Sequence, residues 1–186
     1  MSHMPLQNTS TQSSLLLSSL LAFYKDERHL DRMLSIINGD SKTSLRIVDW
    51  FATNYAKKYW TVYSLPRARR FKVYNDYKLK LRSYSKRRFD PFCRWERISV
   101  PYKDGTAIQT TLGQLNFFKW AIENGVIDYI DTHHAAIEAD MNMRNSSSRR
   151  ARGSTSGKTR KRREELSVSA VKSVKQEDVE ITISFD

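Results

Sequence analysis

The chain has 186 residues, of which 39% are hydrophobic and 28% charged, and its formal net charge is +12. A chain of this length buries one hydrophobic core, so we expect one domain, and the positive charge makes nucleic acid the expected partner ahead of an anionic membrane surface. The single cysteine, Cys93, excludes an internal disulfide and a cysteine-based zinc site, which favours a reducing compartment.

The N-terminal part of the chain predicts helices behind a short polar segment. Residues 1–13 are rich in Ser, Thr and Gln, and we expect them to be disordered. The apolar run Ser14–Phe23 is too short to span a bilayer, and no Lys or Arg precedes it as in a signal peptide, so we predict a helix packed on the core. The helical pattern either continues or restarts through Ile37 and ends at Asn38-Gly39. A further helix, Leu45–Lys58, is predicted to begin after Ser44 as its N-cap.

The middle of the chain predicts two short strands and a basic helix. Trp60–Tyr63 and Phe71–Tyr74 are rich in β-branched and aromatic residues, which favours strands. Helical spacing returns over Asp76–Arg88, where Lys and Arg surround one apolar stripe, so this helix is the best candidate to follow a phosphate backbone. The stripe consists of Tyr77, Leu81 and Tyr84. Asp90-Pro91 ends the helix, because the residue before a proline avoids the α region.

A hairpin and two more helices are predicted next. The extended runs Arg97–Tyr102 and Thr106–Thr110 flank an Asp-Gly pair, which is a strong hairpin signal. Thr111 and Gln114 match a capping box, which opens a helix that ends at Asn124-Gly125. A last helix is expected from Val126 to about Met143. Its acidic residues are expected to face solvent, namely Asp128, Asp131, Glu138 and Asp140.

Together these patterns predict a mainly helical α+β fold. We expect a single compact domain over residues 14–143, with about five helices and a small β-hairpin or sheet, between disordered termini. Residues 144–186 are expected to form a disordered basic tail, because Ser, Arg, Lys and Gly dominate from residue 145 to 175 and no aromatic residue occurs there.

Positive charge and aromatic rings are interleaved between residues 57 and 97. Ten rings in this segment give the backbone enough apolar area to fold, while 14 cations against three acidic residues make its surface basic. We expect these cations to contact the phosphate backbone of nucleic acid without strong sequence reading, with exposed rings stacking on unpaired bases. They are Lys57, Lys58, Arg67, Arg69, Arg70, Lys72, Lys78, Lys80, Arg82, Lys86, Arg87, Arg88, Arg94 and Arg97.

Two short motifs stand out in the tail. Arg149 and Arg150 are followed after ten residues by a second basic cluster, the arrangement of a bipartite nuclear import signal bound by an import carrier. The second cluster consists of Lys161, Arg162 and Arg163. A nonspecific nucleic-acid-binding tail is the alternative. Lys175 lies in an apolar-Lys-x-Glu pattern, typical of an acceptor site for a small ubiquitin-like modifier, although so short a pattern also arises by chance.

Residues for catalysis or metal binding are few. His29 begins an H-x-x-R pattern, but no set of phosphate-binding residues follows it to complete a strand-cleaving tyrosine enzyme. Cys93 reads as a structural cysteine. Asp131, His134 and Glu138 share helical spacing, yet a solvated helix face is the favoured interpretation because nothing else completes a metal shell. We therefore expect no catalytic residue, no metal and no cofactor.

Three segments carry a resemblance to a known family, namely Ser44–Tyr59, Phe71–Ile98 and Ile108–Ile130. The most specific sequence motifs in these segments are Asp49-Trp50-Phe51, the run from Tyr84 to Phe92 and the run from Thr111 to Trp120. Over residues 27–142, the chain resembles small basic proteins of nucleocytoplasmic large DNA viruses. The resemblance implies a viral origin and a role with viral DNA, and it carries over no catalytic residue.

We expect a non-enzymatic viral protein that binds nucleic acid, DNA above all, in genome packaging, organisation or transcription. It would act in the host nucleus or the viral factory and be packaged in the virion, without a membrane partner. The alternative is a structural or adaptor virion protein whose basic face docks an acidic protein, and the third hypothesis is a nucleic-acid-processing enzyme.

Overall fold

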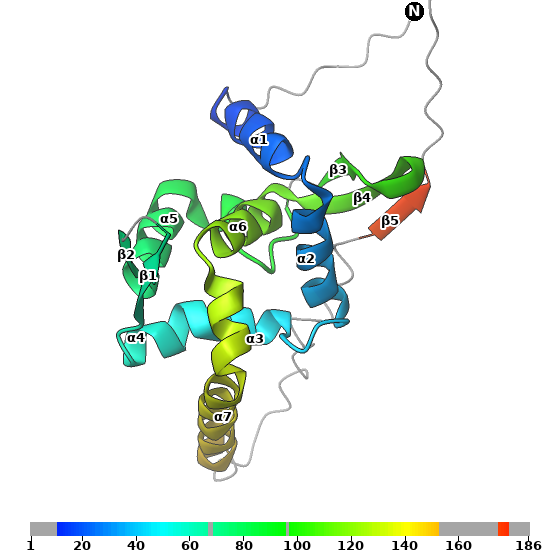
Figure 1. Cartoon of the computed structure of the whole chain (residues 1–186). Coiled ribbons are helices and arrows are strands. Elements are labelled where there is room, and N and C mark those ends of the chain that lie inside the picture. The colour runs from blue at the N-terminus through cyan, green and yellow to red at the C-terminus, as the bar shows by residue number, and fades with distance from the viewer. Residues whose placement is uncertain (1–10, 67–68, 96, 153–174, 179–186) are drawn as a thin grey trace, which may run out of the picture.

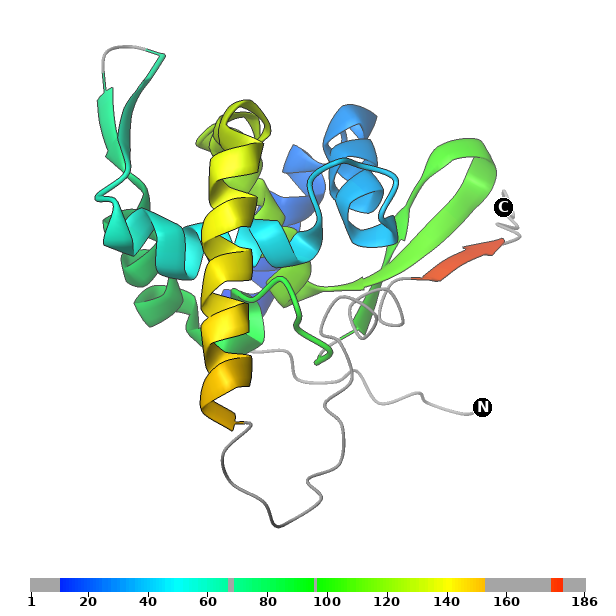
Figure 2. The ribbon, with the colours of Figure 1, turned by 90° about the horizontal axis from the view of Figure 1, so that it is seen from below.

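The computed structural model describes residues 11–66, 69–95, 97–152 and 175–178. Within these ranges the fold is mainly helical, as predicted, with two small antiparallel sheets. Figures 1 and 2 show a helical body from which two β-hairpins project on opposite sides.

Two N-terminal helices are joined by a short turn. Helix α1 (Thr11–Phe23) starts before the expected Ser14, so the end of the segment expected to be disordered is helical, while residues 1–10 lie outside the described residues. Asp26 caps α2 (Glu27–Asn38) by accepting a hydrogen bond from the backbone of its first turn. Gly39 ends the helix as predicted, since its φ of 85° suits a residue without Cβ.

The predicted helix from Leu45 to Lys58 is present but is not regular throughout. It consists of α3 (Leu45–Trp50), a π-helical segment η1 (Phe51–Tyr55) and α4 (Ala56–Lys58). Ser44 is the N-cap, with its side chain accepting a hydrogen bond from the Ile47 amide at 3.3 Å. The wider π turn has no signature in the apolar spacing, which is why the sequence predicted one α-helix.

The first hairpin follows α4, and its two strands differ in position from the predicted ones. Strands β1 (Val62–Leu65) and β2 (Arg69–Lys72) pair antiparallel, with Val62 opposite Lys72. The expected ranges, 60–63 and 71–74, are each displaced toward the outer ends of the hairpin. For β2 the reason is that Val73 already belongs to the next helix, and for β1 it is that Trp60 has φ 50°, outside the β region.

Helix α5 (Val73–Arg88) follows β2 without a loop and so begins before the predicted Asp76. Near its C-terminal end Ser85 has φ 60° and ψ 168°, which separates the last turn from the rest of the helix. This backbone region is adopted almost only by glycine and costs a serine about 1–3 kcal/mol. Phe89 follows the helix and is buried.

The second hairpin is formed as predicted and gains a third strand. Strands β3 (Arg97–Pro101) and β4 (Thr106–Thr111) flank a single 3-10 turn, η2 (Lys103–Gly105), in which Gly105 has φ 73°. Strand β5 (Lys175–Asp178) pairs antiparallel with β4. Lys175, expected in a disordered tail, is therefore the first residue of a strand, opposite Gln109.

Two helices complete the body. Thr111 caps α6 (Leu112–Glu123) by accepting a hydrogen bond from the Gln114 amide at 3.2 Å, as the capping-box motif predicted. Helix α7 (Val126–Arg152) continues past the expected end at Met143 into the segment that was expected to be disordered. The apolar spacing used for that prediction ends near Met141, the last buried residue described in α7, while the backbone stays helical beyond it.

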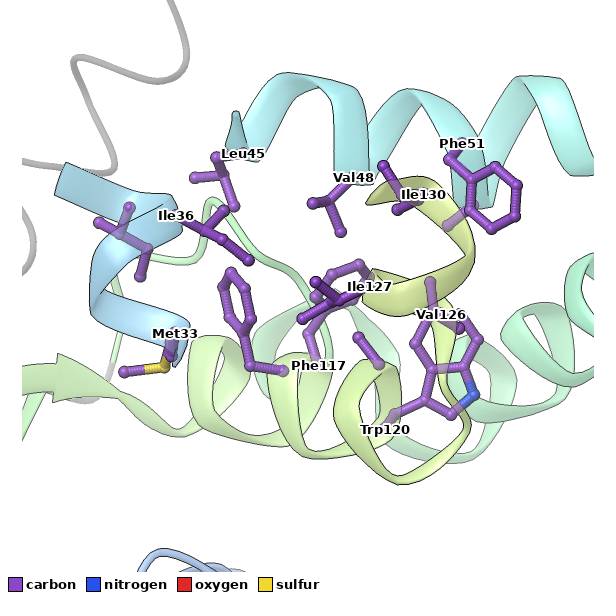
Figure 3. Packing of buried hydrophobic residues seen from close by; sticks show 14 of the residues in the cluster. Met33, Ile36, Leu45, Val48, Phe51, Phe117, Trp120, Val126, Ile127 and Ile130 are labelled. Atoms are coloured by element: carbon purple, nitrogen blue, oxygen red, sulfur yellow. The ribbon is translucent and has the colours of Figure 1, made fainter. Parts of the chain in front are cut away.

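The core lies where α7 starts, between α3 and α6. Figure 3 shows Ile127 and Ile130 of α7 between Val48 of α3 and the rings of Phe117 and Trp120 of α6. These residues are buried. Helices α5 and α6 pack against each other, so the core also supports the basic part of the chain.

Candidate nucleic-acid interface

The described residues include 13 of the 14 predicted cations, which lie on α4, β2, α5 and the start of β3 and in the loop between α5 and β3. The exposed ones with a described side chain are Lys57, Lys58, Arg70, Lys72, Lys78, Arg82, Lys86, Arg87, Arg94 and Arg97, and Lys80 and Arg88 are half-buried. Arg67 lies outside the described residues, and only the backbone of Arg69 is described.

Lys58 has an internal partner. Its ammonium contacts the carboxylate of Asp140 in α7, whose side chain is 7% exposed. Trp50 Nε1 and the Tyr59 hydroxyl each donate a hydrogen bond to the same carboxylate at 3.1 Å. Burial raises the pKa of Asp140, but the hydrogen bonds from Lys58, Trp50 and Tyr59 outweigh it and hold the pKa below its ordinary value. The expectation that Asp140 faces solvent was wrong, because α7 crosses α3 there.

The C-terminal end of α5 leads into a loop that gathers three cations around an aromatic ring. We call residues Lys86–Trp95 the basic loop. The Arg87 guanidinium lies 6.0 Å from the centre of the Trp95 ring, a cation–π arrangement, and this ring is 65% exposed. Arg87 and Trp95 line a cavity with a volume of about 330 Å³, and Lys86 and Arg94 line it as well. The remaining lining residues are Asp90, Phe92 and Cys93.

Polar side chains of α6 and its cap hold the backbone of the basic loop. Asn116 Nδ2 donates to the Arg88 carbonyl at 2.8 Å, Gln114 Nε2 donates to the Pro91 carbonyl at 3.2 Å, and the Thr111 hydroxyl donates to the Cys93 carbonyl at 3.3 Å. All three donors are buried. Buried hydrogen bonds of this kind fix a loop, because leaving a carbonyl or amide unpaired costs about 1–3 kcal/mol.

Close packing holds the loop from a second side. Cys93 is buried, as expected of a structural cysteine, and its thiol donates to the Arg87 carbonyl at 3.3 Å. It touches α6 at Gly113, where a Cβ would lie 2.7 Å from Cys93 Cβ. Phe89 inserts among rings from both helices, 5.9 Å from Tyr77 and 5.6 Å from Trp120. The basic loop is therefore part of the core on its inner side.

The sequence did not predict the hydrogen bonds by which α6 side chains hold the basic loop, which we call the α6 clamp. Gln114 was interpreted only as half of a capping box, and Asn116 was passed over. The available signal was the presence of two amides among the apolar residues of the first half of α6, because buried amides require hydrogen-bonding partners.

Helix α5 shows the two-faced character that was predicted for it, with a shallower inner face. Tyr77, Leu81 and Tyr84 pack against the core but are only half-buried. On the outer side Lys78 and Arg82 line a hollow of about 500 Å³ that also contains Leu79, which is 60% exposed.

A second exposed aromatic ring, that of Trp60, lies near the start of the basic segment. Trp60, between α4 and β1, is 79% exposed and has φ 50°, in the left-handed region that a bulky residue rarely adopts. It borders a small cavity of about 100 Å³ with Lys72, Tyr74 and Asn75. Lys57 lies over the Tyr74 ring at 5.7 Å.

Two carboxyl groups lie close together at the basic loop, Asp90 within the loop and Asp49 in α3. Burial raises the pKa of Asp49 to about 6, the neighbouring charge of Asp90 adds to this, and Lys86 partly offsets it. Burial also raises the pKa of Asp90, while a hydrogen bond from the Phe92 amide at 2.8 Å opposes the rise. The cations of the basic loop thus lie next to two carboxyl groups whose pKa values are raised above the ordinary value.

Comparison with known proteins places the chain in a family. Residues 2–186 match a family described as of unknown function, DUF7197. The chain belongs to this family. The match includes the tail, which lay outside the expected resemblance over residues 27–142. "Uncharacterized protein L507" of Acanthamoeba polyphaga mimivirus is 43% identical over an alignment of 127 residues that covers 64% of this chain. The alignment covers 49% of L507, so the chain spans about half the length of that curated relative. No solved structure matches.

The expected resemblance to large DNA viruses agrees with this giant-virus relative of the DUF7197 chain. The segments that carried the resemblance include the basic loop and the start of α6, which the structure brings into contact. Two stretches distant in sequence thus belong to one structural unit.

The remaining candidate residues of the DUF7197 chain have structural partners. His29 stacks on Phe23 with ring centres 4.0 Å apart. Asp131 accepts hydrogen bonds from Arg32 and Thr43, and His134 Nε2 donates to the Lys42 carbonyl at 3.0 Å. In the part of the chain that the structure describes, no three His, Cys, Asp or Glu side chains form a group that could hold a metal ion. The described helices are also too short or too polar to cross a membrane.

The tail motifs lie mostly beyond the described residues. Arg149 and Arg150 belong to the end of α7, where only the backbone is described. The second basic cluster, residues 161–163, lies outside the described residues. The nuclear import signal and the modification of Lys175 stay predictions.

Proposed function

We propose that this chain is a non-enzymatic DNA-binding protein that contacts the phosphate backbone through α5 and the basic loop. The observation that carries the proposal is the basic loop itself. Arg87 and Arg94 form no ion pair with another described residue, yet the backbone that bears them is fixed by buried side chains of α6. A fixed loop whose Arg87 and Arg94 have no ion pair among the described residues suits a ligand that carries negative charge.

The spacing of the cations supports a phosphate backbone as that ligand. Lys78 and Arg82 are one helical turn apart on the outer side of α5, and Lys86 follows after the break at Ser85. A row of cations along one helix can contact successive phosphates, and each contact releases a condensed counterion. DNA is favoured over RNA because the resemblance is to proteins of DNA viruses.

The biological setting is proposed on the same grounds. Genome packaging, organisation or transcription in the host nucleus or the viral factory would all use backbone contacts without base reading. The import signal of the tail would supply entry to the nucleus.

Salt-dependent DNA binding tests the proposal. We expect the Arg87→Ala/Arg94→Ala variant to weaken binding to a fluorescent duplex and to reduce the slope of log affinity against log salt by up to about 2. The matched control is Arg28→Ala/Lys103→Ala, which removes the same charge from α2 and the β3–β4 turn, where both cations are in surface ion pairs. The control should leave the slope nearly unchanged.

Three outcomes would contradict the proposal. One is an unchanged slope in the Arg87→Ala/Arg94→Ala variant, and another is an equal reduction in the control, which would indicate net charge alone. The third is no retention of the wild-type chain on DNA at low salt, which would favour the alternative of an acidic protein partner.

A further inference from the structure

The cavity of the basic loop is lined by both an aromatic ring and cations. One wall is the exposed ring of Trp95 with the Arg87 guanidinium over it, and the rim carries Lys86 and Arg94. Phosphate contacts alone would require only the cations. A tryptophan that is 65% exposed beside them adds a flat apolar surface, which a phosphate does not use but a nucleobase does.

From this juxtaposition we infer that the cavity binds one unpaired nucleobase, stacked on the Trp95–Arg87 pair, with the adjoining phosphates on Lys86 and Arg94. The inference rests on the proposed function and makes it more specific. In a duplex the base faces are covered by their neighbours, so only a single strand, a frayed end or a junction can supply such a base. The chain would then prefer DNA with unpaired bases.

The size and the edge of the cavity agree with this ligand. Its volume of about 330 Å³ is at the lower end of the range for small-ligand sites, which is about 300–1,000 Å³. Asp90 lines it with a carboxylate that can accept a hydrogen bond from the exocyclic amine of a base.

The site exists before any ligand arrives. Gln114 and Asn116 hold the Pro91 and Arg88 carbonyls, and Gly113 provides the space that Cys93 fills. A loop that is already ordered loses little conformational entropy on binding, so stacking contributes to affinity almost in full. The strained backbone of Ser85 at the start of the loop is the kind of outlier that surrounding packing must maintain, and such outliers concentrate at binding sites.

The test compares a single-stranded 12-mer with a blunt 12-base-pair duplex, both fluorescently labelled, in binding titrations of the full chain. We expect Trp95→Ala to weaken binding to the single strand by roughly 5- to 150-fold, which corresponds to the loss of one stacked base. Binding to the duplex should change less than about twofold, and Trp95→Phe should restore most of the single-strand affinity.

The salt slope separates stacking from charge. Trp95→Ala should leave the slope for the single strand unchanged, because a ring releases no counterion, whereas Arg94→Ala should reduce it by about 1. Thermal melting of Trp95→Ala should match the wild type, since the ring is mostly exposed.

The failure of the base pocket is distinguishable from the failure of DNA binding. If Trp95→Ala weakens both ligands equally or neither, while the wild type still binds duplex with a steep salt slope, the pocket is refuted and the proposed function stands. If the wild type binds neither DNA, both are refuted.

Discussion

Replacing Asp49 by asparagine should make the protein more stable at neutral pH. Asp49 of α3 lies close to the basic loop, where burial and the charge of Asp90 raise its pKa from 3.8 to about 6 despite the opposing effect of Lys86. The folded protein therefore binds this proton more tightly than the unfolded chain does. The resulting stabilisation is fully present below the unfolded pKa and is lost as the pH rises through about 6.

The magnitude follows from the size of the shift. A difference of about 2 pKa units at about 1.4 kcal/mol per unit corresponds to about 3 kcal/mol between pH 4 and pH 7.5. Asparagine has nearly the same shape and does not ionise, so Asp49→Asn should raise the free energy of unfolding at pH 7.5 by up to about 3 kcal/mol. That is a large part of the 5–15 kcal/mol that is typical of a domain.

Urea denaturation at several pH values between 4 and 7.5 measures this effect. The difference in unfolding free energy between Asp49→Asn and wild type should grow with pH and level off above about pH 7. Asp128→Asn serves as the control for an exposed carboxylate, because its side chain is 81% exposed and its replacement should change the free energy of unfolding by less than about 0.5 kcal/mol at pH 7.5. Parallel pH curves for wild type and Asp49→Asn would refute the reasoning.

Three further changes test the backbone and the buried carboxylate. Ser85→Gly should keep or raise the melting temperature, because relief of about 1–3 kcal/mol of strain exceeds the entropic cost of glycine. The control Ser83→Gly, in the regular part of α5, should lower the stability by about 0.5–1 kcal/mol, and equal losses at both sites would contradict the strain at Ser85. Trp60→Gly should also melt no lower than wild type, since relief of about 1–2 kcal/mol of backbone strain in the left-handed region offsets the loss of an exposed ring. A melting temperature several degrees lower would show that the Trp60 ring contributes to packing. Asp140→Ala should destabilise the protein by about 2 kcal/mol in chemical denaturation at pH 7, because it leaves Trp50 and Lys58 without their acceptor. This loss should shrink as the pH falls toward the lowered pKa of Asp140, and a loss independent of pH would indicate lost packing instead.

The features that the sequence determined by itself are those set by neighbouring residues. Ser44 and Thr111 cap the helices that follow them, Gly39 ends α2, and Gly105 allows the turn of the second hairpin. A cap or a turn satisfies backbone groups a few residues away, so its signal is contained within a short window. The mainly helical class followed from the sum of these local signals.

The tertiary structure alone decided which distant residues meet. Asp140 lies on a helix whose other carboxylates lie nearer to solvent, and only the crossing of α7 with α3 places it against Trp50 and Lys58. The pairing of β5 with β4 and the clamp of Asn116 on the Arg88 carbonyl depend in the same way on partners far along the chain. Such contacts leave no periodic pattern in the sequence, because each is made by one side chain reaching one position in space, and they determine which cations form the candidate interface.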